Sequence, residues 1–318
     1  MSIGSSYSVG RATPGPPPLP DTRAAVSSSP RLLAAAVCVL LGLALTGAFF
    51  VWTYPGQWLD GVLLPRAERG GGYAQQSTLL DPARSVLAAF GRTTTLAGLL
   101  GAVLLVGLVG RRLLAGLAGV GTVVCAVLVA GATKSALLRP DLQVETSTTH
   151  NSFPSGHVAA AMTLLLAFLL VLPARARWWL ALPGAAGVTV IAGATMVAGW
   201  HRFSDALGGV LLGVALFCLA AAVLAGRPGA VRSAPGAVRS APAGAGAVRP
   251  GLTEGVVGLL ALGCLLLLVV PGLRAALPPG ALVAVLAVAV PVVLAVGSAV
   301  YLLRSVDLAR PVNRSTKG

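Results

Sequence analysis

Runs of about twenty apolar residues recur along most of this chain, and they limit its fold more than any other feature of the sequence. A helix of about 20 apolar residues crosses the hydrocarbon core of a bilayer. Only 10% of the residues are charged and the mean hydropathy is +0.87, values that exclude an ordinary soluble domain. The sequence therefore predicts an all-α, polytopic membrane bundle, with spans at 32–54, 85–110, 113–133, 156–173, 178–200, 205–225, 255–270 and 281–303.

These spans fall into two groups, separated by a segment of low complexity. Residues 1–31 are rich in Pro, Ser and Gly and predict a disordered cytoplasmic tail, followed by a six-helix core at 32–226. Residues 227–254 form a Pro/Gly/Ala/Arg linker, in which the unit Pro-Gly-Ala-Val-Arg-Ser-Ala occurs twice. A two-helix membrane appendage at 255–303 and a cytoplasmic tail at 304–318 complete the expected organisation.

The placement of Lys and Arg predicts which ends of the spans face the cytoplasm. With eight spans both termini lie on one side, and cytoplasmic termini place most of the 23 basic residues inside. The net charge of +14 then fits positive-inside topology, and because the basic residues are scattered among loops it does not indicate nucleic-acid binding. The expected outer residues are Arg66, Arg69, Arg84, Arg92, Lys134, Arg139, Arg202 and Arg274.

Tryptophans lie at both ends of the span 178–200, and one of the outer connections is long. Trp178, Trp179 and Trp200 fit anchors at the membrane interface better than ligand contacts. The longest outer connection, residues 55–84, has two interpretations, a plain connecting loop or the edge of a substrate entrance, and the plain loop is favoured.

The segment from Pro154 to His157, Pro-Ser-Gly-His, immediately precedes an apolar run. Ser155 is a good N-cap, Gly156 lets a ligand approach the backbone, and the first amides of a helix bind phosphate. His157 would bring a proton donor to such an anion site. An ordinary capped helix start is the alternative. All three histidines, His150, His157 and His201, fall in the two outer connections that flank the fourth and sixth predicted spans. Chance would scatter histidines through the chain.

His201 and Asp205 are four positions apart at the start of a predicted helix. This spacing lets the carboxylate hold one imidazole nitrogen and leaves the other free to attack phosphorus. The alternatives are a solvated interfacial pair or an Asp that only caps the helix. Lys134 and Arg139 would supply positive charge for a phosphate, or would be simple interfacial anchors.

The order Lys134, Arg139-Pro140, Pro-Ser-Gly-His, then His201 and Asp205 resembles the type 2 phosphatidic acid phosphatase family, lipid phosphate phosphatases that share a site with vanadium haloperoxidases. The resemblance covers roughly the six-helix core. It implies His201 as nucleophile, Asp205 as its orienting partner and His157 as general acid. It also implies a phosphate-holding set of Lys134, Arg139, Ser155 and Gly156. The family needs no metal or other cofactor, and the sequence has no acidic cluster that would hold a metal.

Two features depart from the family pattern. Four residues, instead of six, separate Lys134 from Arg139-Pro140, and on a continuous helix this places the two cations about 140° apart. Pro140 biases Arg139 away from helical geometry, which would allow a loop to restore their convergence. The family Ser-Arg before the nucleophile is replaced by Ala194 and Thr195, for which Arg202, or less directly Arg92, is the candidate substitute cation.

The resemblance implies an integral membrane lipid phosphate or pyrophosphate phosphatase. It would act at the extracytoplasmic face through a phosphohistidine, on a phosphorylated lipid that enters from the bilayer, such as an isoprenoid pyrophosphate. One alternative is a phospho-group transferase to an alcohol acceptor. The other is a catalytically decayed lipid-binding or transport protein, which the missing arginine would favour.

Overall fold

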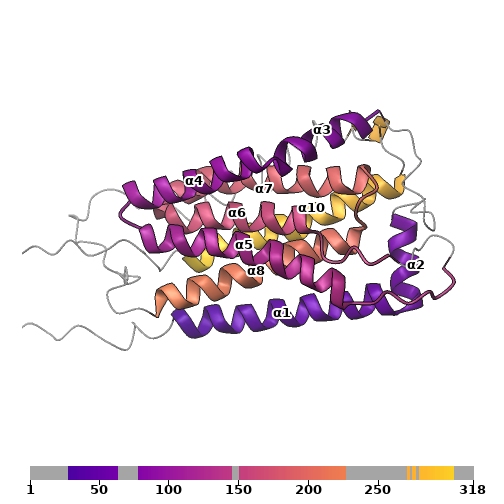
Figure 1. The fold of residues 1–318 in the computed structure, drawn as a ribbon, viewed down its shortest axis with the longest axis horizontal. Coiled ribbons are helices and arrows are strands. Elements are labelled where there is room, and N and C mark those ends of the chain that lie inside the picture. The colour runs from indigo at the N-terminus through magenta and orange to yellow at the C-terminus, as the bar shows by residue number, and fades with distance from the viewer. Residues whose placement is uncertain are drawn as a thin grey trace, which may run out of the picture.

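The computed structural model describes residues 28–63, 78–144, 150–226, 271–272, 274–276 and 279–303. The expected linker and the expected span 255–270 lie outside these residues. Within them the regular structure is helical, and the predicted all-α polytopic bundle is confirmed (Figure 1). The helices are α1 (Ser28–Trp52), α2 (Tyr54–Leu63), α3 (Leu80–Gly91), α4 (Thr93–Val109), α5 (Leu113–Ala136), α6 (Gly156–Val171), α7 (Ala174–Val197), α8 (Phe203–Ala225) and α10 (Pro279–Leu302).

Several of these helices are long and apolar enough to cross a membrane. Among the described residues there are five of them, in α1, α5, α7, α8 and α10, and a sixth if α3 and α4 together form one span. The chain is therefore a multi-pass membrane protein. The expected single helix over 85–110 is wrong, because α3 and α4 are bent by 56° where Arg92 adopts an extended conformation between them.

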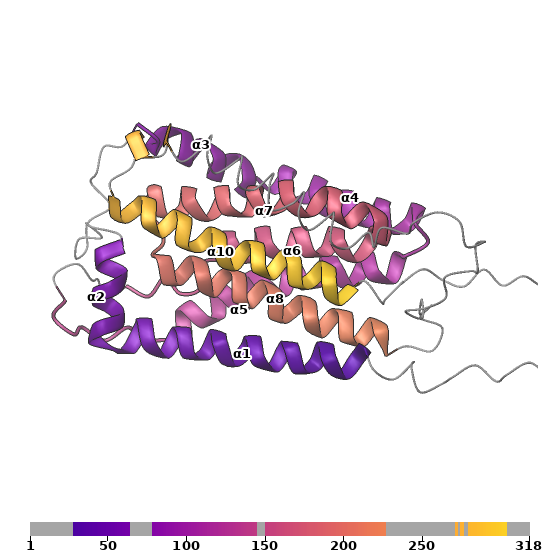
Figure 2. The same cartoon turned by 180° about the vertical axis from the view of Figure 1, so that it is seen from behind.

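Helix α6 is the centre of the bundle. It has only 16 residues, it is apolar on every side, and nearly all of its side chains are buried against α4, α5, α7 and α8. A helix that is hydrophobic all round belongs inside a protein, and α6 accordingly faces other helices (Figure 2). Helix α10 packs against α7 and α8.

Buried arginines hold together the end of the bundle where α6 finishes. Arg177, 1% exposed, donates from Nε to the carbonyl of Leu169 at 2.9 Å and from Nη1 to that of Leu303 at 2.7 Å. Arg112 donates to the carbonyl of Leu172 at 2.5 Å. The last carbonyls of a helix receive no N–H donor from the helix itself, so a guanidinium that donates to them stabilises the helix end.

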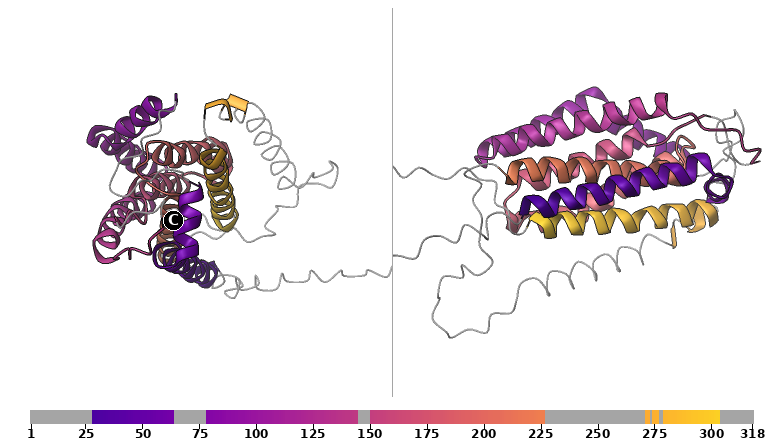
Figure 3. Two further views of the ribbon diagram at one scale, coloured as in Figure 1. Left: turned by 90° about the vertical axis from the view of Figure 1, so that its right-hand side faces the viewer. Right: turned by 90° about the horizontal axis from the view of Figure 1, so that it is seen from below.

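Helix α2 lies across the opposite end of the bundle, nearly perpendicular to α1 (Figures 1 and 3). This segment was expected to be plain loop, and that expectation is wrong for Tyr54–Leu63. Gln57 and Asp60 of α2 are buried, at 1% and 0% exposed. Two buried polar side chains on a short helix indicate that it packs onto polar groups of the bundle end.

Candidate active site

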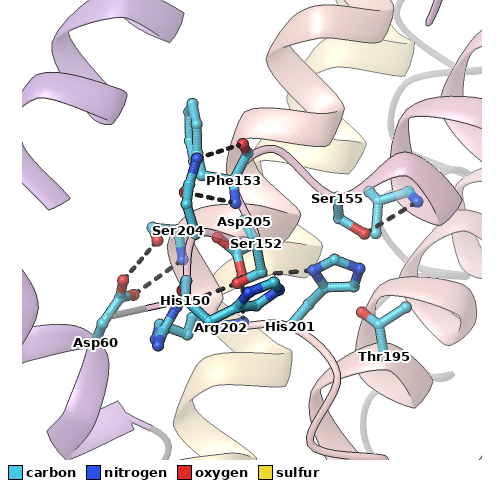
Figure 4. Close-up of polar contacts among 12 residues, drawn as sticks. Asp60, His150, Ser152, Phe153, Ser155, Thr195, His201, Arg202, Ser204 and Asp205 are labelled. Atoms are coloured by element: carbon cyan, nitrogen blue, oxygen red, sulfur yellow. Dashed lines mark hydrogen bonds and ion pairs between the residues drawn. The ribbon is translucent and has the colours of Figure 1, made fainter. Parts of the chain in front are cut away.

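The predicted site residues belong to the end of the bundle that α2 crosses, where α5 and α7 end and α6 and α8 begin (Figure 1). Figure 4 shows Ser155, His201 and Asp205 at this end. The amide of Ser155 donates to the backbone carbonyl of Asp205 at 2.8 Å, which joins the start of α6 to the start of α8. The two motifs that the sequence separates by more than forty residues are thus in direct contact.

His201 and Asp205 form the pair that their spacing predicts. Nδ1 of His201 lies 3.4 Å from Oδ2 of Asp205, and the two side chains are 7% and 0% exposed. His201 itself precedes α8, whose first residue is Phe203, so it belongs to the connection from α7. With Nδ1 toward the carboxylate, Nε2 is the ring nitrogen that remains for another partner.

The carboxylate of Asp205 is held in place by further donors. The hydroxyl of Ser152 donates to Oδ2 at 2.5 Å, and the backbone amide of Arg202 donates to the same oxygen at 2.8 Å. Hydrogen bonds to an ionised acceptor are among the stronger ones in proteins. The orientation of Asp205, and through it that of His201, is therefore set by two separate segments of the chain.

The start of α6 is a capped helix N-terminus with free backbone amides. Ser155 is the N-cap, and its Oγ accepts the amide of Val158 at 3.5 Å while its carbonyl accepts that of Ala159 at 3.0 Å. The amides of Gly156 and His157 precede the first amide that has an intrahelical acceptor, that of Ala159, and they lie at the positive end of the helix dipole. They are suited to phosphate oxygens.

Glycines of α8 allow this segment to lie directly on the helix that carries Asp205. A Cβ on Gly209 would lie 2.8 Å from the carbonyl oxygen of Ser155, and one on Gly208 would lie 2.4 Å from the ring of Phe153. Real Cβ atoms essentially never come so close to other heavy atoms. The absence of side chains at these two positions therefore permits the contact between Ser155 and Asp205.

His157 is half-buried beside aromatic and charged neighbours. Its ring centroid lies 5.7 Å from that of Trp200, with the planes tilted by 49°, and a Cβ on Gly91 at the end of α3 would lie 3.5 Å from Nε2. His157 is also within electrostatic range of His201 and Lys134. The structure thus brings the two histidines and the lysine into one cluster.

The structure resolves the spacing problem between Lys134 and Arg139. Helix α5 ends at Ala136, so Arg139 lies in the loop that follows and is not bound by helical geometry. Both cations are within electrostatic range of Asp205. Arg139 is 5% exposed, and burial, reinforced by Arg202, lowers its pKa to about 10, so that it remains a cation at neutral pH.

The position of the missing family arginine carries no charge here. The side chain of Thr195 is fully buried and donates to the carbonyl of Ala192 at 2.8 Å. Its own carbonyl accepts the amides of Trp200 and His201 at 3.0 and 3.2 Å. Thr195 therefore supports the backbone of the candidate nucleophile.

Arg202, the expected substitute cation, is buried in the same network. Its Nη1 donates to the hydroxyl of Ser152 at 3.1 Å and to the carbonyl of His150 at 3.5 Å. The guanidinium thus braces the loop before α6 and stands beside the Asp205 carboxylate. The side chains of His150 and Arg92 are exposed.

Sequence reasoning missed Asp60. Oδ1 of Asp60 accepts the amide of Ser204 at 3.0 Å and Oδ2 accepts its hydroxyl at 2.5 Å. Burial, with Asp205 nearby, raises the pKa of Asp60 to about 7. The available signal was the spacing of Gln57 and Asp60, three positions apart, which places two polar residues on one face of a helix.

Among the described residues, no three His, Cys, Asp or Glu side chains come together as a group that could hold a metal ion. Residues 117–227 match the family model described as PAP2 superfamily, a region that runs from α5 through α8 and contains every site residue named from the sequence. No curated protein and no solved structure gave a match. Residues 117–227 are therefore similar to the PAP2 superfamily, and this match supports a type 2 phosphatidic acid phosphatase-like family.

Proposed function

We propose that this protein hydrolyses a lipid phosphate or pyrophosphate at the extracytoplasmic face of the membrane, through a phosphohistidine on His201. A PAP2 domain among membrane-spanning helices fits a membrane phosphatase. The observation that carries the proposal is the His201–Asp205 pair, which lies against the N-terminus of α6 with His157 in the same cluster. This arrangement supports a nucleophile, a proton donor and an anion site that act on one phosphate.

In the first half-reaction Nε2 of His201 attacks phosphorus, and the bond from phosphorus to the leaving oxygen breaks. His157 gives its proton to that oxygen, and Asp205 stabilises the imidazolium on His201. Lys134, Arg139 and the first amides of α6 offset the charge on the phosphoryl oxygens.

In the second half-reaction a water molecule attacks the phosphohistidine. His157 now accepts the proton of the water, the bond between phosphorus and Nε2 breaks, and phosphate leaves. The enzyme returns to its starting protonation state without a metal ion.

The substrate class follows from the surroundings of the site. A phosphorylated lipid can place its headgroup at the polar end of the bundle while its chain stays beside the apolar helices, as an isoprenoid pyrophosphate or a phosphatidate would. Arg111, Arg112 and Arg177 lie at the other end of the bundle, and positive-inside topology assigns that end to the cytoplasm. This distribution supports cytoplasmic termini and an outward-facing site.

The test is phosphate release by the purified, detergent-solubilised protein from phosphatidate, phosphatidylglycerophosphate and an isoprenoid pyrophosphate, with glycerol present as an alcohol acceptor and EDTA as chelator. We expect free phosphate from at least one lipid, undiminished by EDTA and inhibited by vanadate, which mimics the transition state. Label found on glycerol in place of free phosphate would show a transferase. Lipid binding with no phosphate released from any substrate would contradict the proposal and indicate a binding or transport protein.

A further inference from the structure

The carboxylate of Asp60 makes a two-point contact with a single residue 144 positions away. Oδ1 accepts the amide of Ser204 at 3.0 Å, Oδ2 accepts its hydroxyl at 2.5 Å, and the Asp60 side chain is fully buried. Figure 4 shows Asp60 reaching Ser204 from the side of the site opposite Thr195. Two bonds on two oxygens fix both the distance and the rotation of Ser204 relative to α2.

Ser204 occupies a sensitive place in the chain. It lies between His201 and Asp205, in the first turn of α8, where the amide of Arg202 also bonds to Asp205. A shift of Ser204 would move the carboxylate that orients the imidazole. The contact between Asp60 and Ser204 therefore affects the orientation of His201, although Asp60 does not contact His201.

The same helix also holds the loop that carries Arg139. Nε2 of Gln57, one turn before Asp60, donates to the carbonyl of Pro140 at 3.0 Å and to that of Val51 at 2.9 Å. The indole of Trp52, at the end of α1, donates to the carbonyl of Leu138 at 2.9 Å. The corner between α1 and α2 thus contacts the backbone on both sides of Arg139.

Charge supports a role at the site for Asp60. The ionisable groups that bear on it are Arg202 and Asp205 at the start of α8 and Arg139 in the loop after α5. Both arginines attract its carboxylate and Asp205 repels it. A fully buried carboxylate is costly unless cations and hydrogen bonds compensate it. Here residues of the site supply part of that compensation, although burial and Asp205 outweigh it and raise the pKa of Asp60.

We propose that Asp60 is a positioning residue for His201, and that α2 acts as a clamp which joins the first turn of α8 to the Arg139 loop. The proposal rests on the proposed function. It assigns a catalytic contribution to a helix outside the PAP2 match, which begins at residue 117. A purely structural helix cap is the competing explanation, because an acidic side chain at a helix N-terminus stabilises the helix by itself.

The experiment compares Asp60→Ala, Asp60→Asn and Ser204→Ala with the full-length wild-type protein, with p-nitrophenyl phosphate as the probe. Asp60→Ala is expected to lower kcat about 100-fold with KM within about threefold, since a small misplacement of a reacting group has an effect of that size. Asp60→Asn keeps an oxygen for the Ser204 amide, and its kcat should be at least about tenfold higher than that of Asp60→Ala. Ser204→Ala should fall between wild type and Asp60→Ala. Val62→Ala, on the exposed face of α2, is the control for disturbance of the helix and should stay within about twofold.

Rates are measured well below the unfolding temperature of every variant. If Asp60→Ala and Ser204→Ala keep the wild-type kcat and lose only thermal stability, Asp60 is a cap and the inference is wrong. If Asp60→Ala does not fold, the kcat values of Asp60→Asn and Ser204→Ala test the inference instead. Wild-type kcat in both of these variants would again show that the inference is wrong. Wild-type turnover in His201→Ala would instead remove the proposed function, so the two failures are distinguishable.

Discussion

His201→Ala is expected to abolish phosphate release, with kcat reduced by about 10⁴-fold or more. Removal of a nucleophile eliminates the covalent route, and what remains is the acceleration from binding and electrostatics alone. His201 is also the only one of the three histidines with an imidazole nitrogen at ion-pair distance from a carboxylate among the described residues. The measurement is the steady-state rate on the best lipid substrate.

The control for this variant is His150→Ala. The side chain of His150 is exposed, and the network uses only its backbone carbonyl, which alanine keeps. We expect a rate within about threefold of wild type. Both variants are checked for an unchanged elution volume and unfolding temperature. Turnover above about a tenth of the wild-type rate in well-folded His201→Ala would contradict the assignment of the nucleophile.

Asp205→Asn is expected to lower kcat by about 10² to 10⁴-fold with a smaller effect on KM. Oδ2 of Asp205 receives the hydroxyl of Ser152 and the amide of Arg202 and faces Nδ1 of His201, so all three neighbours present donors to it. An amide has no negative charge to stabilise the imidazolium. The effect of such a change on a histidine held by a carboxylate is of this size in hydrolases.

Ser152→Ala is the matched control, because it removes one donor to Asp205 and keeps the carboxylate. It should lower kcat by about tenfold, and by about 150-fold at most, since one hydrogen bond to a charged group contributes about 1.5 to 3 kcal/mol. The prediction is wrong if Asp205→Asn lowers kcat no more than Ser152→Ala does. The carboxylate would then serve as a helix cap and not as the partner of His201.

The membrane bundle and the two polar motifs were predictable because each rests on local information. The length of an apolar run such as Leu113–Ala136 indicates a span, and the residue type and position of Ser155 indicate a helix start. The pairing of His201 with Asp205 needs only the geometry of one turn of chain. What these features share is that no distant residue is required to form them.

The features that the sequence did not reveal depend on tertiary contacts. Asp60 is buried against Ser204, a residue 144 positions later in the chain, and the position of α2 depends on such contacts with the bundle end. The break at Arg92 occurs without a proline, next to the point where Gly91 lies close to the ring of His157. The distances between α6 and α8 depend on glycines whose role becomes visible only when the helices are packed together.

The most direct test of the account is to trap the covalent intermediate. Wild-type protein is mixed with a ³²P-labelled lipid substrate, quenched within milliseconds in alkali, where phosphohistidine is stable, and digested for peptide mapping. The account predicts label that is lost in acid, lies on the peptide containing His201 and is absent from His201→Ala. Label on any other residue, or rapid turnover with no labelled protein at any time point, would contradict it.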